Sequence, residues 1–585
     1  MIDRRGVGEV LNRVAFAAEL LDDSTVDAKV VSGLAWALRS IEGDLTMERV
    51  AGLDGVNVPI LALIDDAANE RVPPLLADLE RRLPHGLLEV RRVKGLGPKK
   101  IRALWQQLDI TSIGELEYAC KENRLVELKG FGKKTQDSVL AHIAALRERA
   151  GFLRLDHALA IVRAIAAQIP DLHIAGALRR RTEIVASIDL VTTTPAPIVA
   201  AALKALAHID DDDATDATDA NVTNVTNDAN GANGANGANG ANGANGEGAS
   251  SSLGTFIRVR LGAAQVNIRA GVNGDHLGAA LIIDTGSDEH VAMLRARGAL
   301  ESLVGDEAAV YDALGLLEHT PERREAGVSL VEKGKARPRL VRLLDLNGSL
   351  HNHTTASDGD ASMLQMRDAA AARGLAYLAI TDHSQSAVYA HGLAAATLSA
   401  QKKEARALSD GSCTVLCGVE SDILKDGALD YADEVLRALD VVVASVHARF
   451  GQKGPDLTAR MVAAARHPCT DIVGHPTGRL LLGRAPSEYD VDAFFDACAH
   501  SGCALEMNAN PARLDLNEKH LAQAKALGIP ISIAADAHAV HELDYLEYGV
   551  SIARRAGLTP DDVLNARPLV DVKAWIGARR QKAHG

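Results

Sequence analysis

Aromatic side chains are scarce in this 585-residue chain. Phe, Trp and Tyr together contribute 3% of the residues, whereas hydrophobic residues of all kinds contribute 47%. The interior must therefore be built mostly from alanine, leucine and valine. A chain of this length is expected to form three or four domains, because single cores rarely grow beyond about 250–300 residues.

Disulfide frameworks, zinc fingers and membrane spans are also missing from the sequence. The six cysteines are scattered without zinc-finger spacing, and we find no run of about 18 apolar residues. The N-terminal residues lack the apolar core and cleavage signal of a leader peptide. We expect buried, reduced thiols and a soluble cytoplasmic monomer that does not contact a membrane.

Net positive charge is absent as well, since the formal net charge at pH 7 is −14. An acidic protein gains no general attraction to nucleic acid. Any binding to DNA must then depend on local basic patches or on backbone amides that hold phosphates.

Two short segments in the first 150 residues supply such patches. Residues 93–101 and 128–134 share a hydrophobic–x–Gly–hydrophobic–Gly–x–Lys pattern, which resembles the helix-hairpin-helix motif of DNA-binding proteins. The glycines permit a tight turn, and amides at the start of the second helix can hold a DNA phosphate without reading sequence. A third copy at residues 53–57 lacks the second glycine and is predicted to be degenerate. The candidate DNA-binding residues are Gly95, Gly97, Lys99, Lys100, Gly130, Gly132, Lys133 and Lys134.

The pattern of residue types along the sequence changes after residue 150. Residues 184–194 and 255–270 are rich in alternating β-branched side chains, which predicts strands. Between them, residues 210–252 form a low-complexity segment of Asp, Thr, Asn, Gly and Ala. This segment has almost no large apolar side chains to offset the entropy lost on ordering, so we expect a disordered insertion between two strands.

Beyond residue 343, apolar strand-like runs alternate with helical stretches. Each run ends in His, Asn or Thr, and the runs cover residues 375–381, 440–447, 470–475, 503–508 and 530–538. This order is typical of a parallel β/α barrel, which carries its chemistry at the C-terminal ends of its strands.

Six histidines and three acids follow the predicted strands of this region. In segments 351–353 and 536–538, two of them stand at positions i and i+2, which a strand directs to the same side. Imidazole and carboxylate groups bind zinc, manganese and iron, and nine of them suffice for three ions with positions left for water and a phosphate. The candidate ligands are His351, His353, Asp358, His383, Glu420, His447, His475, Asp536 and His538.

Residues 345–580 resemble the PHP (polymerase and histidinol phosphatase) family, in the form fused to bacterial family X DNA polymerases. The matching strings include HNHTTASDG, AITDHS, VVASVHARF, IVGHPTGRLLLGR and LEMNANPARLDL. The resemblance implies a phosphoesterase with three divalent ions (Mn, Zn or Fe). It assigns one ion to His351, His353, Glu420 and Asp536, a second to Glu420, His447 and His475, and a third to Asp358, His383 and His538. It also suggests that Arg479 or Arg513 clamps a phosphate oxygen during catalysis.

Residues 155–330 resemble the palm of family X polymerases, in which Arg179 belongs to the motif that ends at Asp189. Nucleotidyl transfer by two magnesium ions needs three carboxylates. Here Ser187 occupies the first position, Asp189 the second and Asn267 the third, so two negative charges are lost. We predict that magnesium does not bind at this degenerate site and that polymerase activity is absent or severely weakened. The motif's Arg179, Arg180 and Glu183 would then hold the palm fold together.

These patterns predict a multidomain α/β protein. The expected parts are an N-terminal helical domain at residues 1–85 with the degenerate hairpin and a helix-hairpin-helix region at 86–152. A mixed α+β nucleotidyltransferase-like palm and thumb follows at 153–335, and a distorted (β/α)7 PHP barrel at 343–585.

The leading hypothesis is a metal-dependent phosphoesterase that acts as a 3′→5′ exonuclease or end-processing enzyme in DNA repair. The hairpin lysines favour DNA over a free metabolite, and the complete ligand set argues against a non-catalytic role. Three alternatives stay open. They are a bifunctional DNA polymerase and 3′→5′ exonuclease, a small-molecule phosphatase of the histidinol phosphate type, and a non-catalytic DNA-end-binding protein.

Overall fold

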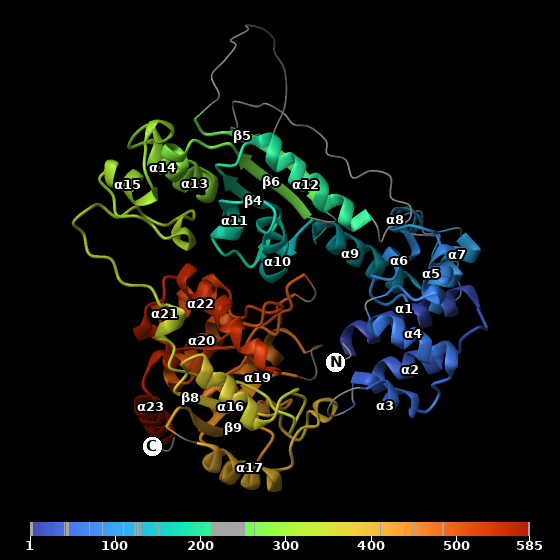
Figure 1. Cartoon of the computed structure of the whole chain (residues 1–585). Coiled ribbons are helices and arrows are strands. Elements are labelled where there is room, and N and C mark those ends of the chain that lie inside the picture. The colour runs from blue at the N-terminus through green and yellow to red at the C-terminus, as the bar shows by residue number, and fades with distance from the viewer. Residues whose placement is uncertain are drawn as a thin grey trace. The chain divides into compact units, whose positions relative to one another are not determined.

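A computed structural model shows that the chain forms two compact units, Met1–Ala150 and Gly151–Gly585 (Figure 1). The structure describes residues 4–39, 41, 46–69, 71–84, 86–108, 110–121, 125, 128, 130–149, 151–211, 252–261, 264–409, 411–447, 452–482 and 485–582. The predicted insertion at 210–252 therefore lies outside the described residues, apart from its two ends. At the first end, helix α12 (Ala196–Asp211) includes Asp210 and Asp211.

The first unit is helical throughout its described residues. Its helices are α1 (Arg4–Leu21), α2 (Ala28–Arg39), α3 (Met47–Ala51), α4 (Val58–Ala68), α5 (Pro74–Arg81), α6 (Gly86–Val90), α7 (Pro98–Leu108), α8 (Ile113–Lys121) and α9 (Lys133–Arg149). Helix α1 packs against α2, α4, α5 and α7. Its buried face includes Val7, Leu11 and Val14, which stand at helical spacing, so one amphipathic helix organises the core of this unit.

Three turns of the first unit share one geometry. They join α3 to α4, α6 to α7 and α8 to α9, and each contains a glycine with positive φ: Gly55 at 84°, Gly95 at 89° and Gly130 at 91°. The residue after each glycine donates its amide to a carbonyl three residues earlier, at 3.0–3.3 Å. Glycine adopts this backbone conformation without strain. The copy at residues 53–57, although degenerate in sequence, therefore forms a turn of the same shape.

The second unit begins with a mixed sheet in the order β2-β4-β6-β5. Strands β4 and β6 are parallel, and the outer pairs are antiparallel. The strand predicted at 184–194 is divided into two short strands. The strands are β1 (Leu153–Arg154), β2 (Leu172–Ile174), β3 (Ile184–Val185), β4 (Ile188–Thr192), β5 (Thr255–Leu261) and β6 (Ala264–Ala270). The helices are α10 (Leu155–Ala166), α11 (Gly176–Arg179), α12, α13 (Leu277–Thr285), α14 (Asp288–Arg295) and α15 (Glu307–Ala313).

The predicted barrel is confirmed in the rest of the second unit, where a seven-stranded parallel sheet runs in sequence order from β7 to β13. Its strands are β7 (Gly348–Ser349), β8 (Tyr377–Ile380), β9 (Thr414–Asp422), β10 (Val441–Ser445), β11 (Ile472–Val473), β12 (Ala504–Asn508) and β13 (Ile531–Ala534). A bridge between Asn352 and Ala537 nearly closes the sheet, and the amide of His353 donates to the Ala537 carbonyl at 2.8 Å.

The barrel strands are buried almost throughout, as expected for parallel strands covered on their outer face. The covering and connecting helices are α16 (Met363–Ala372), α17 (Ala395–Leu408), α18 (Asp433–Arg437), α19 (Gly454–Arg466), α20 (Val491–Ser501), α21 (Glu518–Ala526), α22 (Leu546–Arg555) and α23 (Leu569–Lys582). Apolar residues on the two faces of the sheet form two separate clusters, one with Leu378 and Val442 and the other with Tyr377 and Val441. The catalytic end of such a barrel is therefore held by a rigid frame.

Arginines join the palm-like part to the barrel within the second unit. Helix α22 contacts the short 3-10 helix η4 (Pro321–Arg323), and Arg554 pairs with Glu322 at 2.8 Å. Arg555 donates to the carbonyl of Arg180 at 2.6 Å and to the carboxylate of Glu325 at 2.8 Å. Because the Arg555 side chain is only 5% exposed, this junction is held by a buried charge network.

Two expectations about composition can be compared with the structure. All six cysteines lie among the described residues, where they are buried and form no disulfide, as predicted. Among the described residues, none of the helices combines the length and apolar character that crossing a membrane requires.

The turn glycines yield a prediction about stability. Gly130→Ala should destabilise the α8–α9 region by about 1 kcal/mol, because the added methyl group would be held at positive φ. Gly33→Ala is the matched control: Gly33 lies inside α2, and a Cβ there meets no heavy atom within 4 Å. It should stabilise by about 0.5–1 kcal/mol. Amide hydrogen exchange of peptides from the full-length protein measures both values, and shifts of the same sign would contradict the prediction.

Candidate functional site

All seven strands of the barrel direct polar side chains to one end. The positions lie within the last residues of each strand or in the loop that follows it. In strand order they are His351 and His353 (β7), Asp382 and His383 (β8), Glu420 and Asp422 (β9), His447 (β10), His475 (β11), Glu506 and Asn508 (β12), and Asp536 and His538 (β13). Parallel strands bring their C-terminal ends to one edge, so residues almost 190 positions apart in the chain meet here.

Glu420 lies at the centre of the ligand cluster. Its Oε1 is 3.0 Å from Nε2 of His475, 3.1 Å from Nε2 of His447 and 3.3 Å from Nε2 of His351. Its Oε2 is 2.9 Å from Nδ1 of His383. The carboxylate is 1% exposed, and a single group therefore touches histidines from four other strands. This is the position that the resemblance requires of a bridging ligand.

A second set of contacts surrounds Asp536. Its Oδ1 lies 3.1 Å from Nε2 of His353 and 3.5 Å from Nε2 of His351. These three residues form a group whose donor atoms could hold one ion. The first ion implied by the resemblance would use these three residues and Glu420, and the structure brings all four together.

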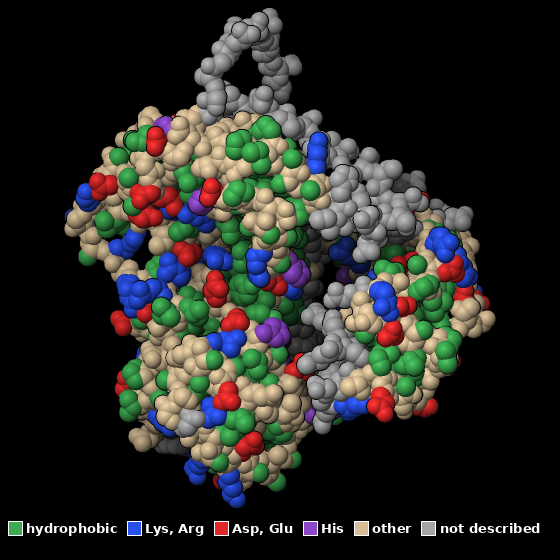
Figure 2. Space-filling view, in the orientation of Figure 1, with side chains coloured by type: hydrophobic (Ala, Val, Ile, Leu, Met, Phe, Trp, Pro, Cys, Tyr) green, Lys and Arg blue, Asp and Glu red, His purple; other side chains and the backbone are tan. Residues whose placement is uncertain are grey.

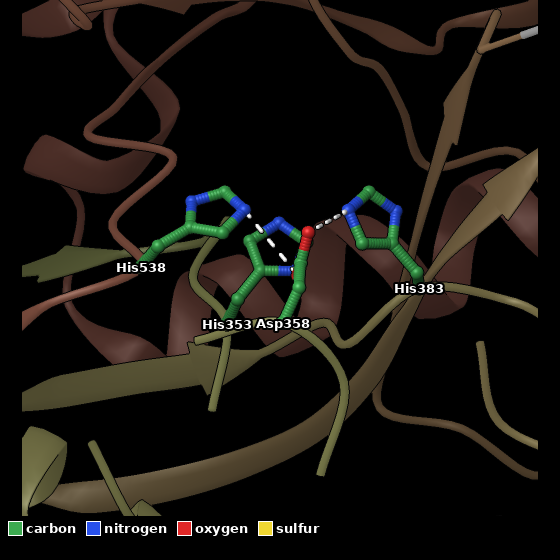
Figure 3. A group of neighbouring side chains, drawn as sticks. All are labelled: His353, Asp358, His383 and His538. Atoms are coloured by element: carbon green, nitrogen blue, oxygen red, sulfur yellow. Dashed lines mark ion pairs between the residues drawn. The ribbon is translucent and has the colours of Figure 1, made fainter. Parts of the chain in front are cut away.

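The third group stands at the mouth of the cluster (Figure 3). Asp358 lies between two histidines, with its Oδ2 3.5 Å from Nε2 of His383 and its Oδ1 3.5 Å from Nε2 of His538. His353 belongs to this group as well, since its ring is stacked on His538 at 4.2 Å. Asp358 and His538 are about 30% exposed, so this side of the cluster is open to solvent.

The chemistry of the donor atoms fits divalent metal ions. Nε2 of His351, Nδ1 of His353 and Oε2 of Glu420 are buried without a hydrogen-bond partner. Buried polar atoms without a partner are costly in folded proteins, and a bound cation would satisfy them. A mixed set of imidazoles and carboxylates suits zinc, manganese or iron.

The groups of the cluster differ in protonation state. Burial would by itself lower the pKa of His383, but Glu420 and Asp358 raise it to about 10, so a metal ion that binds there displaces a proton. Burial lowers the pKa of His353 to about 3, and His538 and His383 act in the same direction. Burial would by itself raise the pKa of Glu420, but His447, His351 and His383 lower it well below its usual range. Neutral imidazole and ionised carboxylate are the forms that bind metals.

Two ligand candidates have a left-handed backbone conformation, with φ of 25° at His475 and 52° at Asp536. Such conformations are uncommon for residues other than glycine and cost free energy. They often occur at functional sites, where the surrounding structure enforces them. Here the amide of His475 donates to the buried carboxylate of Glu506 at 2.5 Å, which holds the first of them in place.

Two buried acids orient the histidines, and the sequence analysis missed both. Nδ1 of His351 lies 2.6 Å from Oε1 of Glu506, and Nδ1 of His447 lies 2.6 Å from Oδ1 of Asp422. A carboxylate on one ring nitrogen fixes the tautomer and presents the other nitrogen to a metal. Strand periodicity offered the signal, since Asp422 follows Glu420 by two positions.

The two arginines proposed as phosphate clamps have different surroundings. Nε of Arg513 lies 3.8 Å from Oδ2 of Asp536, and the Arg513 side chain is 21% exposed. The Arg479 side chain is 9% exposed and pairs with Glu183 of the palm-like part at 2.6 Å. Arg479 is therefore engaged within the protein, whereas Arg513 lies beside a ligand candidate.

The three positions at which the sequence analysis expected a degenerate polymerase site are joined by hydrogen bonds. Asp189 and Asn267 are partners on the parallel strands β4 and β6, and Nδ2 of Asn267 donates to Oδ1 of Asp189 at 2.7 Å. Oγ of Ser187 donates to both carboxylate oxygens, at 3.2 and 3.1 Å. Arg179 is bound by Glu307 and Thr285. The neutral side chains of Ser187 and Asn267 thus both donate hydrogen bonds to the Asp189 carboxylate.

The hairpins of the first unit present backbone amides and lysines. In the α6–α7 and α8–α9 hairpins, apolar residues before and after the first glycine are buried, and Lys99, Lys133 and Lys134 are exposed. Lys100 differs, because its Nζ donates to the Gly95 carbonyl at 3.2 Å and lies 5.5 Å from the centroid of the Phe131 ring. It therefore braces one hairpin against the other.

The α3–α4 turn lacks these features. Oδ1 of Asn57 accepts from the amide of Ile60 at 3.1 Å, so a side chain already caps the helix amide that a phosphate would use. On the face seen in Figure 2, Lys and Arg side chains stand in small groups among acidic ones. Binding of DNA therefore depends on local features such as the two lysine-bearing hairpins.

The barrel and its ligand cluster define a PHP-type metal-dependent phosphoesterase. The sequence profile of the PHP domain matches residues 349–510, and that of the SAM-like helix-hairpin-helix tandem matches residues 87–144. The "DNA polymerase/3′-5′ exonuclease PolX" of Bacillus subtilis (strain 168) is 32% identical over 98% of this chain and 99% of its own length. The chain belongs to this PolX family of bacterial family X DNA polymerases, which confirms the predicted resemblance.

Shorter relatives match part of the chain. A "probable phosphatase" of Thermoanaerobacter sp. (strain X514) is 28% identical over 29% of this chain and 71% of its own length. Another from Caldanaerobacter subterraneus is 24% identical over 43% of this chain and 97% of its own length. The chain thus also shares part of its sequence with proteins that are named as probable phosphatases.

The acids behind the histidines yield a prediction about metal affinity. Glu506→Gln and Asp422→Asn should each weaken divalent metal binding by about 10- to 100-fold, because the imidazole loses the carboxylate that fixes its tautomer. Glu488→Gln is the control, since that exposed carboxylate pairs only with Lys453 among the described ion pairs. Titration of metal-free protein with Mn²⁺ by calorimetry measures the affinities. Equal affinity of wild type and both buried variants would contradict the assignment.

Proposed function

We propose that this protein is a metal-dependent phosphodiesterase that removes nucleotides from the 3′ ends of DNA. The observation that carries the proposal is the cluster of nine candidate ligands that includes Glu420, placed in a chain that also bears two lysine-containing hairpins. The printed name of the Bacillus subtilis relative includes a 3′-5′ exonuclease and supports this choice. We also propose that the chain is divided into four domains, at residues 1–85, 86–152, 153–335 and 343–585.

We propose that the cluster holds three ions in the sets given by the resemblance, with manganese, zinc or iron as candidates. Such ions would supply Lewis acidity and neutralise charge on the phosphoryl group. The protein's own side chains orient the imidazoles and contact the phosphate. Glu506 and Asp422 hold two imidazoles in the tautomer that binds. Arg513 is placed to contact a phosphate oxygen, because its guanidinium lies beside Asp536 and is partly exposed.

The hairpins would hold the DNA backbone and deliver its end to the barrel. Gly95, Gly97, Gly130 and Gly132 leave the turns open to a phosphate, since a Cβ built at each meets no heavy atom within 4 Å. Contacts of this kind carry no sequence information, so we propose sequence-independent binding. A monomer suffices for this arrangement, because all nine ligands come from one chain.

Hydrolysis of defined DNA ends tests the proposal. In Mn²⁺, purified protein should shorten the 3′ ends of recessed, gapped or single-stranded DNA. His351→Ala should lower kcat at least about 100-fold, because it removes a ligand at the centre of the cluster. Replacing Lys99, Lys133 and Lys134 together with alanine should raise KM about tenfold with kcat unchanged, because uniform binding is lost. Labelled DNA on sequencing gels gives the rates and the polarity.

Lys29→Ala is the matched control for the hairpin variant, because Lys29 is an exposed lysine of the same unit outside the hairpins. Its KM should equal that of wild type. Release of phosphate from histidinol phosphate without cleavage of DNA would instead identify a small-molecule phosphatase. Binding to DNA ends without cleavage of either substrate would identify a non-catalytic protein.

We further propose that the palm-like site does not extend DNA. Asp189 is the carboxylate that remains, and it is hydrogen-bonded by Ser187 and Asn267. Primer extension with Mg²⁺ or Mn²⁺ should therefore yield no more product than the Asp189→Ala variant yields. Efficient nucleotide addition that Asp189→Ala abolishes would contradict this proposal and identify a bifunctional polymerase and exonuclease.

A further inference from the structure

A buried ion pair joins the palm-like part to the loops of the ligand cluster. Oε1 of Glu183 lies 2.6 Å from a terminal guanidinium nitrogen of Arg479, and the two side chains are 21% and 9% exposed. Glu183 stands immediately before β3, and its carbonyl accepts from the amide of Leu155 at 3.1 Å. Strands β1 and β3 pair with each other next to this hydrogen bond, so the backbone that carries the Glu183 carboxylate is fixed.

Arg479 in turn holds the loop that follows β12. Its Nε donates to the carbonyl of Arg513 at 3.0 Å, and a terminal nitrogen donates to the carbonyl of Leu514. Leu514 has a φ of 44°, a left-handed conformation that needs support from its surroundings. One guanidinium therefore bridges Glu183 and two consecutive carbonyls of this loop.

The same loop contacts the ligand candidates directly. Its Arg513 side chain reaches within 3.8 Å of Oδ2 of Asp536. Asn508, at the end of β12, donates from Nδ2 to the same oxygen at 3.0 Å. The amide of Asp515 donates to the Asn508 carbonyl at 3.1 Å, so the two ends of the loop are tied together. A shift at residues 513–514 would consequently move Arg513 relative to Asp536.

We propose that Glu183 is a positioning residue for the phosphodiesterase reaction, although it belongs to the palm-like part. It acts through Arg479, which fixes the loop that carries Arg513 beside Asp536. The inference rests on the phosphodiesterase function proposed above. Removing Glu183 leaves a largely buried guanidinium without its counter-charge. Arg479 then turns towards solvent and releases the two carbonyls, and the group that meets the phosphate loses its alignment.

Kinetics of full-length variants in Mn²⁺ test this role, with 3′-labelled DNA and bis(4-nitrophenyl) phosphate as substrates. Glu183→Ala should lower kcat about 10- to 100-fold on both substrates, because small misplacements of a group at the reacting centre have effects of that size. The KM for DNA should change less than about twofold, because DNA binding depends on the hairpins. Glu183→Gln keeps an oxygen acceptor for Arg479 and should retain most of kcat.

Glu322→Ala is the matched control. It removes another carboxylate of the same junction, which pairs with Arg554 and does not touch the loop of residues 508–515. Its kcat should equal that of wild type. A double-mutant cycle adds a second criterion. If Glu183 acts through Arg479, adding Glu183→Ala to an Arg479→Ala variant should cause no further loss of kcat.

Three results would overturn the inference: an unchanged kcat in Glu183→Ala, an equal loss in Glu183→Ala and Glu322→Ala, or fully additive losses in the cycle. Equal losses of kcat in Glu183→Ala and Glu322→Ala would indicate that the junction matters only for folding. If Glu183→Ala melts at a lower temperature than wild type, Glu183→Gln distinguishes a positioning role from a folding role. Failure of wild type to hydrolyse either substrate would reject the proposed function itself, which is a separate outcome from these three.

Discussion

The carboxylate of Glu420 imposes the main constraint on the barrel. An ionised acid with 1% exposure is costly to bury unless positive charge or hydrogen bonds compensate it. Four histidine nitrogens lie within 3.3 Å of its oxygens, but Oε2 of Glu420 and one ring nitrogen each of His351 and His353 still lack a hydrogen bond. Divalent cations meet this need better than protons do, because they satisfy several donors at once. The folded barrel end is therefore organised for metal.

Because Glu420 must stay buried among its histidines, the barrel that carries these residues must be rigid. Candidate ligands that follow six different strands keep their geometry only if the sheet is nearly closed, and the bridge between Asn352 and Ala537 brings its two edges together. The left-handed backbone of His475 and Asp536 adds strain that packing must balance. Glu506 serves both needs, since one oxygen holds the ring of His351 and the other holds the amide of His475.

The sequence indicated the candidate ligands but not the residues that hold them in place. The ligands follow apolar strands, and the regular order of a parallel barrel brings such positions to one end, so local pattern sufficed. Glu506 and Asp422 escaped notice because an acid within a buried strand does not reveal which histidine lies behind it. Arg479 was considered as a phosphate clamp, but its partner Glu183 lies 296 positions away in the chain. Local patterns carry no information about a contact of that kind.

Several residues of the palm motif make contacts within the second unit. Ser187 and Asn267 replace carboxylates that metal-dependent nucleotidyl transfer requires, and they now hydrogen-bond Asp189 instead. Arg180 and Glu183 of the same motif are engaged differently, because Arg555 binds the carbonyl of one and Arg479 the carboxylate of the other. These contacts do not depend on whether the palm-like part binds metal ions. If it does not, as we propose, it can still be required, provided that its charged side chains hold the loops of the neighbouring centre.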